Sequence, residues 1–186
     1  MYLFGYGSLI NITSAQKSFK RKLKQVDLIP VSIKGYEKIW NAIEYIQFAD
    51  KIKINGVFLN LEKSNLKKTN GVLIKITDEE LKTLKIREKN YSCITIKAND
   101  VEGYSLDEDV IAFMTTTKDR IATNTSKNCF IASKYIDILT NSFNVYSDDF
   151  VLEYKKSLST FPFPLKTGTY SFCDPLQHKI AREGIQ

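Results

Sequence analysis

The first ten residues, MYLFGYGSLI, combine a short apolar run with a glycine-containing turn. Residues 1–4 predict a buried strand, and residues 5–8 predict the turn that ends it. Because glycine has no Cβ, Gly5 and Gly7 allow such a turn to present backbone N–H groups to a ligand oxygen. The chain has no G-x-G-x-x-G, G-x-x-x-x-G-K-S/T or G-x-S-x-G motif, so the turn does not indicate a nucleotide site or an α/β-hydrolase.

Glu88 is a carboxylate in an unusual position. On the helix expected over residues 78–88, Leu81 and Leu84 set the buried face, and Glu88 falls within about 20° of Leu81 at about 100° per residue. Desolvation and the negative end of the helix dipole would both raise its pKa, as a general base near neutral pH requires. The alternative is a frayed helix end at which Glu88 pairs with Arg87 or Lys89. Spacing alone leaves both open.

Several short segments are expected to position these residues. Apolar alternation bounded by Gly, Asn and Asp predicts strands over residues 28–36, 54–62, 70–77, 90–97 and 110–117. Helical periodicity predicts helices over residues 78–88, 134–144 and 148–159, with Thr77, Ser133 and Ser147 as their caps. Thr77 and Glu80 have the spacing of a capping box, which makes the first helix the best defined.

These elements predict an α+β protein with mixed or antiparallel strands and flanking helices. A chain of 186 residues with 43% hydrophobic content fits one domain with one core. We expect residues 1–159 to form this domain. Residues 160–186 contain Pro162, Pro164 and Pro175 and are expected to be an irregular C-terminal extension of the same domain.

The cysteine and histidine content argues against several kinds of site. Cys93, Cys129 and Cys173 are far apart and form no C-x-x-C pair, so neither a disulfide framework nor a zinc site is expected. The only histidine, His178, has no motif around it that would supply a base to a nucleophilic cysteine. We therefore expect three reduced thiols, no metal and no cofactor.

Charge and hydropathy limit the kinds of binding partner and the location that we expect for the protein. The net charge is +6, and its densest basic run, residues 17–24, lacks interleaved stacking aromatics, so it indicates a solvated face rather than nucleic-acid binding. The longest apolar runs are far shorter than the roughly 18 to 20 residues that span a bilayer, and the N-terminus does not resemble a signal peptide. A cytoplasmic protein with a small anionic substrate is expected.

Two stretches together resemble the gamma-glutamylcyclotransferase-like superfamily, which includes the ChaC-type and plant AIG-type proteins. They are FGYGSLI and GVLIKITDEELKTLKIREKNYSCITI. FIASKYIDILTNSF and LIPVSIKGYEKIWN are similar to two further family segments, so the resemblance covers roughly residues 1–159. The chain differs at Lys85, where an aspartate is common in the family, and in its proline-containing tail.

The resemblance implies a small mixed barrel or sheet with flanking helices, and it assigns roles to six residues. It implies that Glu88 is the catalytic acid/base and that the other five bind substrate: Tyr6, Gly7, Ser8, Leu9 and Tyr135. The implied reaction is cofactor-free cyclisation of a γ-glutamyl group to 5-oxoproline with release of an amine, amino acid or peptide. A non-catalytic member that binds a small acidic ligand or a protein partner is the alternative. The leaving group and the oligomeric state stay open.

Overall fold

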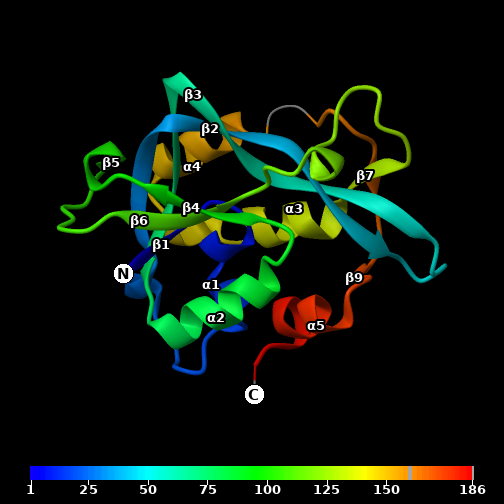
Figure 1. The fold of residues 1–186 in the computed structure, drawn as a ribbon, viewed down its shortest axis with the longest axis horizontal. Helices are drawn as coiled ribbons and strands as arrows, with labels where there is room; N and C mark the ends of the chain where they lie inside the picture. The colour runs from blue at the N-terminus through cyan, green and yellow to red at the C-terminus, as the bar shows by residue number, and fades with distance from the viewer. Residues whose placement is uncertain (159–160, 186) are drawn as a thin grey trace.

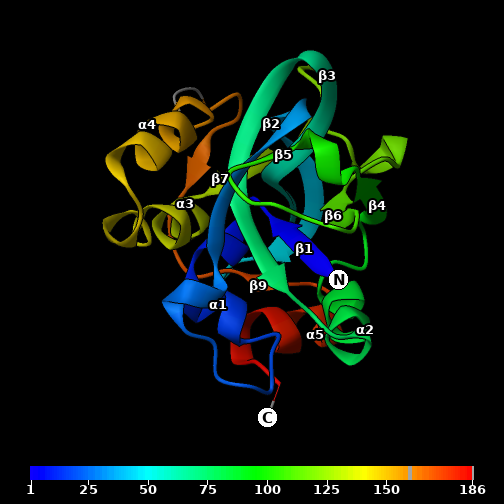
Figure 2. The ribbon, with the colours of Figure 1, turned by 90° about the vertical axis from the view of Figure 1, so that its left-hand side faces the viewer.

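Two long strands, β2 (Ile29–Gln47) and β3 (Lys53–Lys75), form the centre of the structure. The computed structural model describes residues 1–158 and 161–185. The two strands pair antiparallel from Ile29 opposite Leu73 to Gln47 opposite Lys53, with two register shifts along the way. Such irregularities bend a strand and increase its twist, so the ribbon curls as Figures 1 and 2 show.

The remaining strands extend this ribbon into a mixed sheet. They are β1 (Tyr2–Gly5), β4 (Ser92–Ile96), β5 (Val101–Glu102), β6 (Val110–Met114), β7 (Cys129–Ala132), β8 (Leu165–Lys166) and β9 (Ser171–Phe172). The main order is β4-β6-β1-β3-β2-β5, with β7 on β3, β8 on β7 and β9 on β2. Because β1 pairs antiparallel with β3 and parallel with β6, the sheet is mixed. The predicted α+β class is confirmed.

Helices flank the sheet on two sides. They are α1 (Ile12–Gln16), α2 (Asp78–Arg87), α3 (Ser133–Thr140), α4 (Asp148–Lys156) and α5 (Pro175–His178), followed by the π-helical turn η6 (Lys179–Glu183). In Figures 1 and 2, α3 and α4 lie on one side of the ribbon, and α2 and α5 lie together below it. Helix α2 thereby reaches the segment that ends the chain.

The predicted strands and helices are present, with different limits in places. Residues 54–62 and 70–75 belong to one strand, β3, because the strand continues through the exposed polar residues between them. The last two residues of the predicted segment 70–77 lie beyond its end. The predicted cap Ser133 is wrong, since it is the first residue of α3 and Ala132 is the cap. Helix α4 ends at Lys156, and position 159 of its predicted span lies outside the described residues.

The C-terminal segment is more regular than its prolines suggest. Pro175 begins α5, at a helix position that needs no N–H donor, and Asp174 caps the helix by accepting from Gln177 N. The expected boundary between residues 159 and 160 lies outside the described part of the chain. Within that part, residues 171–183 pack against β2 and α2.

The core anchors the strand that leads into the glycine turn. Leu3 and Phe4 of β1 are fully buried, as are Leu73 and Ile74 of the paired strand β3. A Cβ on Gly71 would lie 2.5 Å from the Gly5 carbonyl oxygen, so only glycine lets the end of β1 approach β3 this closely. The turn after Gly5 is therefore held by a rigid, buried strand.

Thr77→Ala is expected to lower the free energy of unfolding by about 1 kcal/mol, the usual cost of losing an N-cap. The Thr77 side chain accepts from Glu80 N at 3.2 Å, and the Glu80 carboxylate accepts from Thr77 N at 2.9 Å, so the predicted capping box is confirmed. Urea unfolding measures the change. Thr83→Ala, in the middle of the same helix, is the matched control, and an equal loss in both variants would contradict the capping role.

Candidate active site

The glycine turn is explained by close packing. Gly7 precedes the 3-10 turn η1 (Ser8–Ile10) with a φ of −104°, which lies outside the left-handed region. A Cβ on Gly7 would lie 2.7 Å from Tyr135 Oη, and one on Gly5 would lie 2.8 Å from Leu9 Cβ. The two glycines therefore let the turn pack directly against η1 and helix α3.

The turn leaves backbone donors free. Its closing hydrogen bonds run from Ile10 N to Gly7 O and from Asn11 N to Ser8 O, at 3.1 and 3.2 Å. The first N–H groups of a helix have no acceptor inside it. Accordingly, among the described residues no hydrogen bond is found for the N–H of Ser8 or Leu9. Both residues line the cavity described below.

Two tyrosine hydroxyls join the turn to other elements by hydrogen bonds. Tyr154 Oη donates to the Tyr6 carbonyl, and Tyr6 Oη donates to the Phe113 carbonyl at 2.7 Å. Burial raises the pKa of both phenols well above the ordinary value, so they stay protonated and keep donating. The turn is thereby fixed to α4 and β6.

Arg87 joins the turn to helix α2. Its side chain is 4% exposed, and its Nη2 donates to Ser8 Oγ at 2.9 Å. It also donates to Ser14 and Ser18, through Nη1 to Ser14 O at 2.9 Å and to Ser18 Oγ at 2.8 Å. Its Nε lies 3.2 Å from Glu88 Oε1. One buried guanidinium thus holds the turn, α1 and the carboxylate in a fixed arrangement.

Glu88 ends helix α2 and faces the cavity. The helix stops at Arg87, and Glu88 is its C-cap, with its N–H donating to Leu84 O at 2.8 Å and its carbonyl accepting from Tyr91 N at 2.8 Å. The side chain is 20% exposed. The sequence left open a frayed helix end at which Glu88 pairs with Arg87 or Lys89. The pairing with Arg87 is present, but hydrogen bonds order the helix end, so it is not frayed.

The pKa of Glu88 is raised despite its cationic neighbour. Desolvation is the largest cause, and the Arg87 charge and hydrogen bond oppose it. The Glu88 carboxyl therefore has the raised pKa that its predicted burial implied. A carboxylate with a raised pKa is a stronger base toward a proton of a bound ligand than that of a free glutamate.

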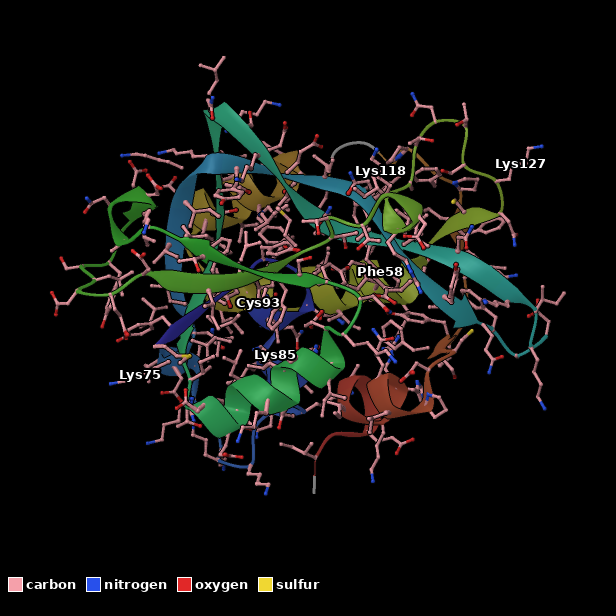
Figure 3. The ribbon with its side chains drawn as sticks, in the orientation of Figure 1. Phe58, Lys75, Lys85, Cys93, Lys118 and Lys127 are labelled. Atoms are coloured by element: carbon pink, nitrogen blue, oxygen red, sulfur yellow. The ribbon has the colours of Figure 1, made fainter. Side chains whose placement is uncertain are left out.

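All six residues predicted for the site line one cavity. The empty space within it is about 750 Å³, part of which is open to solvent. Tyr6, Gly7, Ser8 and Leu9 come from the turn after β1, Glu88 from the end of α2 and Tyr135 from α3. Residues separated by up to about 130 positions in the chain are thus brought together. Lys85, where the sequence differs from the resemblance, is exposed on α2 (Figure 3). It is not among the residues that line the cavity.

Aromatic rings form one wall of the cavity. Tyr135 is 6% exposed, and its ring packs against Phe58 at a centroid distance of 4.8 Å. Phe58, labelled in Figure 3 beside α3, also packs on Tyr170 and Phe172 of the C-terminal segment. Burial raises the pKa of Tyr135, so its hydroxyl remains a donor beside Gly7.

Sequence reasoning missed other lining residues. They include Glu44, Arg87, Tyr91, Tyr170, Gln177 and Arg182. For Glu44 a signal existed, because it shares a strand face with Ala42 and Ile46, both fully buried. For Gln177 and Arg182 no local pattern points to a site, since they reach the cavity only through the packing of α5 and η6.

Glu44 is the second carboxylate of the cavity. It is 3% exposed, and its Oε2 accepts from Asn90 Nδ2 at 2.6 Å and lies 4.0 Å from Arg120 Nη1. Burial raises its pKa to about 7, against the lowering by its Asn90 hydrogen bond. Asn90 belongs to the turn after Glu88, so Glu44 also ties that turn to β2.

The described residues contain neither a recognisable metal-binding cluster nor a helix suited to cross a membrane. The three cysteines are free, and no group of three or more His, Cys, Asp or Glu suited to a metal ion occurs in the described residues. His178 Nδ1 accepts from Phe172 N at 3.3 Å. None of the helices in residues 1–158 and 161–185 has both the length and the apolar character needed to cross a bilayer.

Comparison of sequences finds no matching family model and no matching curated protein. The structure is similar to that of YkqA from Bacillus subtilis, with a TM-score of 0.60 and 20% identity over 88% of this chain and 55% of that chain. This chain therefore spans about half the length of YkqA.

Two further solved structures match over nearly their full length. One is named gamma-glutamyl cyclotransferase, with a TM-score of 0.61 and 15% identity over 99% of both chains. The other is an uncharacterized protein from Homo sapiens, with a TM-score of 0.60 and 15% identity over 96% of both chains. These similarities show that the chain has the gamma-glutamyl cyclotransferase-like fold, as the sequence resemblance implied.

Proposed function

We propose that this chain, with its gamma-glutamyl cyclotransferase-like fold, converts a γ-glutamyl compound to 5-oxoproline and a released amine, amino acid or peptide. One observation carries the proposal: the glycine turn, Glu88 and Tyr135 line a single cavity. The named gamma-glutamyl cyclotransferase among the similar structures supports it. The test is 5-oxoproline release by the purified protein across a panel of γ-glutamyl amino acids, γ-glutamylamines and glutathione.

The reaction is an intramolecular aminolysis. Glu88, as the carboxylate, takes a proton from the α-ammonium of the γ-glutamyl group. The freed amine attacks the γ-carbonyl carbon and forms the ring nitrogen–carbon bond, while the carbonyl oxygen becomes an oxyanion. The oxyanion collapses, the bond to the leaving nitrogen breaks, and Glu88 returns the proton to that nitrogen. The ring nitrogen, which still carries two protons and a positive charge after the attack, then loses one of them to Glu88, which passes it to the released amine. Protons and electrons therefore balance within the substrate and one side chain.

The chain's residues supply orientation and charge stabilisation. The free N–H groups of Ser8 and Leu9 are proposed to bind the developing oxyanion, a role in which fixed donors are effective because they need no reorganisation. Nucleophile and electrophile belong to one molecule, so holding the γ-glutamyl chain in a folded conformation is itself a large part of catalysis. This chemistry requires no metal, nucleotide or covalent enzyme intermediate.

Glu88 supports an enzyme over a protein that only binds its ligand. A desolvated carboxylate costs stability unless it is paired, and here a single cation partly compensates it. A non-catalytic protein has no need of such a group at a cavity wall. For a pure binder of an acidic ligand, a carboxylate in this position would also repel the ligand.

Gly7→Val is expected to weaken substrate binding by about 10- to 100-fold, because the added side chain would collide with Tyr135 Oη at the cavity wall. Titration with a γ-glutamyl ligand measures the affinity, and a thermal melt checks the fold. The smaller Gly7→Ala change can be compared with a Gly7→Ala, Tyr135→Phe double variant, in which the colliding oxygen is removed. If Gly7→Val binds the ligand as tightly as the wild type, the turn is not part of the substrate site.

The turnover rate is expected to fall on acidification through a pKa above the roughly 4.3 of a free glutamate. Glu88 must be ionised to accept a proton, and burial raises its pKa, so the active form is present above that pKa and lost below it. A pH profile of kcat measures this limb. Glu44→Gln is the control, because the pKa of Glu44 is also raised, to about 7, and its titration would add a limb to the wild-type profile. The acid limb that persists in Glu44→Gln belongs to Glu88. A turnover rate that stays constant as the pH falls to about 4.3, the pKa of a free glutamate, would contradict the assignment of Glu88 as the base.

A further inference from the structure

Lys38 of β2 is a buried lysine that the proposed reaction does not use. It is 7% exposed, and its Nζ donates to the Asn70 carbonyl at 2.9 Å and to Asn70 Oδ1 at 2.8 Å. The same nitrogen lies 3.4 Å from the centroid of the Tyr154 ring. An ammonium has three N–H donors, and here two oxygens and one ring face offer three acceptors. The surroundings of Lys38 therefore fit its charged form.

This charge is not there to stabilise the fold. Among the described residues, the hydrogen-bond partners of Lys38 Nζ are both oxygens of Asn70, and neither is a carboxylate. Burial lowers the pKa of Lys38 well below its ordinary value, against the opposing charge of Glu153. A buried charge of this kind costs free energy, and an apolar side chain of similar volume is often as good or better. Packing alone therefore gives no reason for a lysine at this position.

A continuous set of contacts leads from Lys38 to the glycine turn. Tyr154 of α4 is fully buried, and its Oη donates to the Tyr6 carbonyl. A cation over the ring holds the ring in place and polarises it, so the hydroxyl becomes a stronger donor. Asn70 Nδ2 donates to the Phe150 carbonyl at 2.8 Å, so the same cluster also fixes the helix that carries Tyr154.

The Tyr6 carbonyl belongs to the same peptide unit as the Gly7 N–H. In a trans peptide these two groups point in opposite directions, and the described chain contains no cis peptide bond. Because the carbonyl points to Tyr154, the Gly7 N–H points away from Tyr154. Gly7 lines the cavity, and Tyr154 does not. In the part of the chain that the structure describes, no hydrogen bond is found for the Gly7 N–H, so it is a further donor available to a ligand.

We propose, on the basis of the proposed function, that Lys38 is a positioning residue for the substrate-binding turn. It holds the Tyr154 hydroxyl on the Tyr6 carbonyl, and this contact directs the Gly7 N–H at an oxygen of the γ-glutamyl group. Without the contact the peptide unit could turn over at little steric cost, because the glycine that follows it accepts both orientations. Lys38 is not among the residues that line the cavity, so it acts through Tyr154 and not by touching the substrate.

NMR spectroscopy of this peptide unit tests the proposal without any turnover. Tyr6–Gly7 is the only Tyr–Gly pair in the sequence, so protein isotope-labelled at tyrosine carbonyl carbons and glycine nitrogens gives one resonance for it. The carbonyl carbon shift changes when the oxygen loses a donor. Tyr154→Phe should therefore move the resonance, and Lys38→Met should move it in the same direction. Lys34→Met, exposed on the same strand, should leave it in place.

The double variant shows whether Lys38 acts through the Tyr154 hydroxyl. In a Tyr154→Phe background, Lys38→Met should move the resonance little further. A wild-type resonance in Lys38→Met, or a movement that is as large without the hydroxyl as with it, would overturn the inference. Thermal melts show that each variant is folded. Lys38→Gln keeps a donor for Asn70 and lacks the charge over the ring, so it takes the place of Lys38→Met, with the same expected result, if that variant does not fold.

Kinetics extend the test to the substrate. Lys38→Met and Tyr154→Phe should each lower kcat/KM for γ-glutamylalanine by about 10-fold, the effect of one hydrogen bond, and the double variant should lose about as much as either, because both act on one contact. Losses that multiply in the double variant, or an unchanged kcat/KM in Lys38→Met, would contradict the positioning role. If no γ-glutamyl compound is converted, the proposed function fails, and the resonance alone decides whether Lys38 sets the turn.

Discussion

Glu88→Gln is expected to keep the fold and lose turnover of γ-glutamyl substrates by about 10²–10⁴-fold, the usual cost of removing a general base. Glutamine has nearly the same shape and can still accept from Arg87, whose Nε lies 3.2 Å from Glu88 Oε1. It cannot take a proton from the substrate ammonium. The measurement is 5-oxoproline release under saturating substrate, which reports kcat.

The matched control for this variant is Glu79→Gln, an exposed glutamate on the same helix that pairs with Lys82 on the surface. It should have the turnover of the wild type. A thermal melt of Glu88→Gln close to that of the wild type would show that the loss is chemical. If Glu88→Gln releases 5-oxoproline as fast as the wild type, another group is the base.

Arg87→Met is expected to lower the free energy of unfolding by about 3–5 kcal/mol, the range for breaking a buried ion pair by removing one partner. Arg87 is 4% exposed, and its loss leaves Glu88 without its cation. The Ser14 carbonyl and the Ser18 hydroxyl would lose their donor as well. Urea unfolding of the wild type and the variant measures the difference.

Lys85→Met is the control for Arg87→Met, because Lys85 is exposed on the same helix and surface substitutions change stability by roughly 0.5 kcal/mol or less. Similar, small losses in both variants would contradict the central structural role of Arg87. Activity should fall in Arg87→Met alone. With the cation gone, the pKa of Glu88 would rise further, so the acid limb of its pH profile should move upward.

Those parts of the site that depend on local sequence could be predicted from it. The strand before Gly5, the capping box of Thr77 and Glu80 and the end of α2 near Glu88 all follow from contacts within a few residues. Such signals do not depend on how distant segments pack. The same holds for the α+β class, which follows from the alternation of strand and helix patterns.

The remaining features depend on packing between distant segments. That residues 54–62 and 70–77 form one strand depends on pairing with β2, and the polar residues between them hide it. Arg182 reaches the cavity only because α5 and η6 fold back against α2. The predicted cap Ser133 is wrong because α3 begins directly after strand β7, so the residue before it, Ala132, takes the cap position.

The central claim is cyclisation by the substrate's own amine, and product analysis in isotopically labelled water tests it most directly. Purified protein is incubated with γ-glutamylalanine in water carrying heavy oxygen, and the products are weighed by mass spectrometry. The account predicts 5-oxoproline without heavy oxygen, together with an equal amount of alanine. Glutamate that carries heavy oxygen would show hydrolysis by water and would contradict the account, and so would the absence of any product from the whole substrate panel.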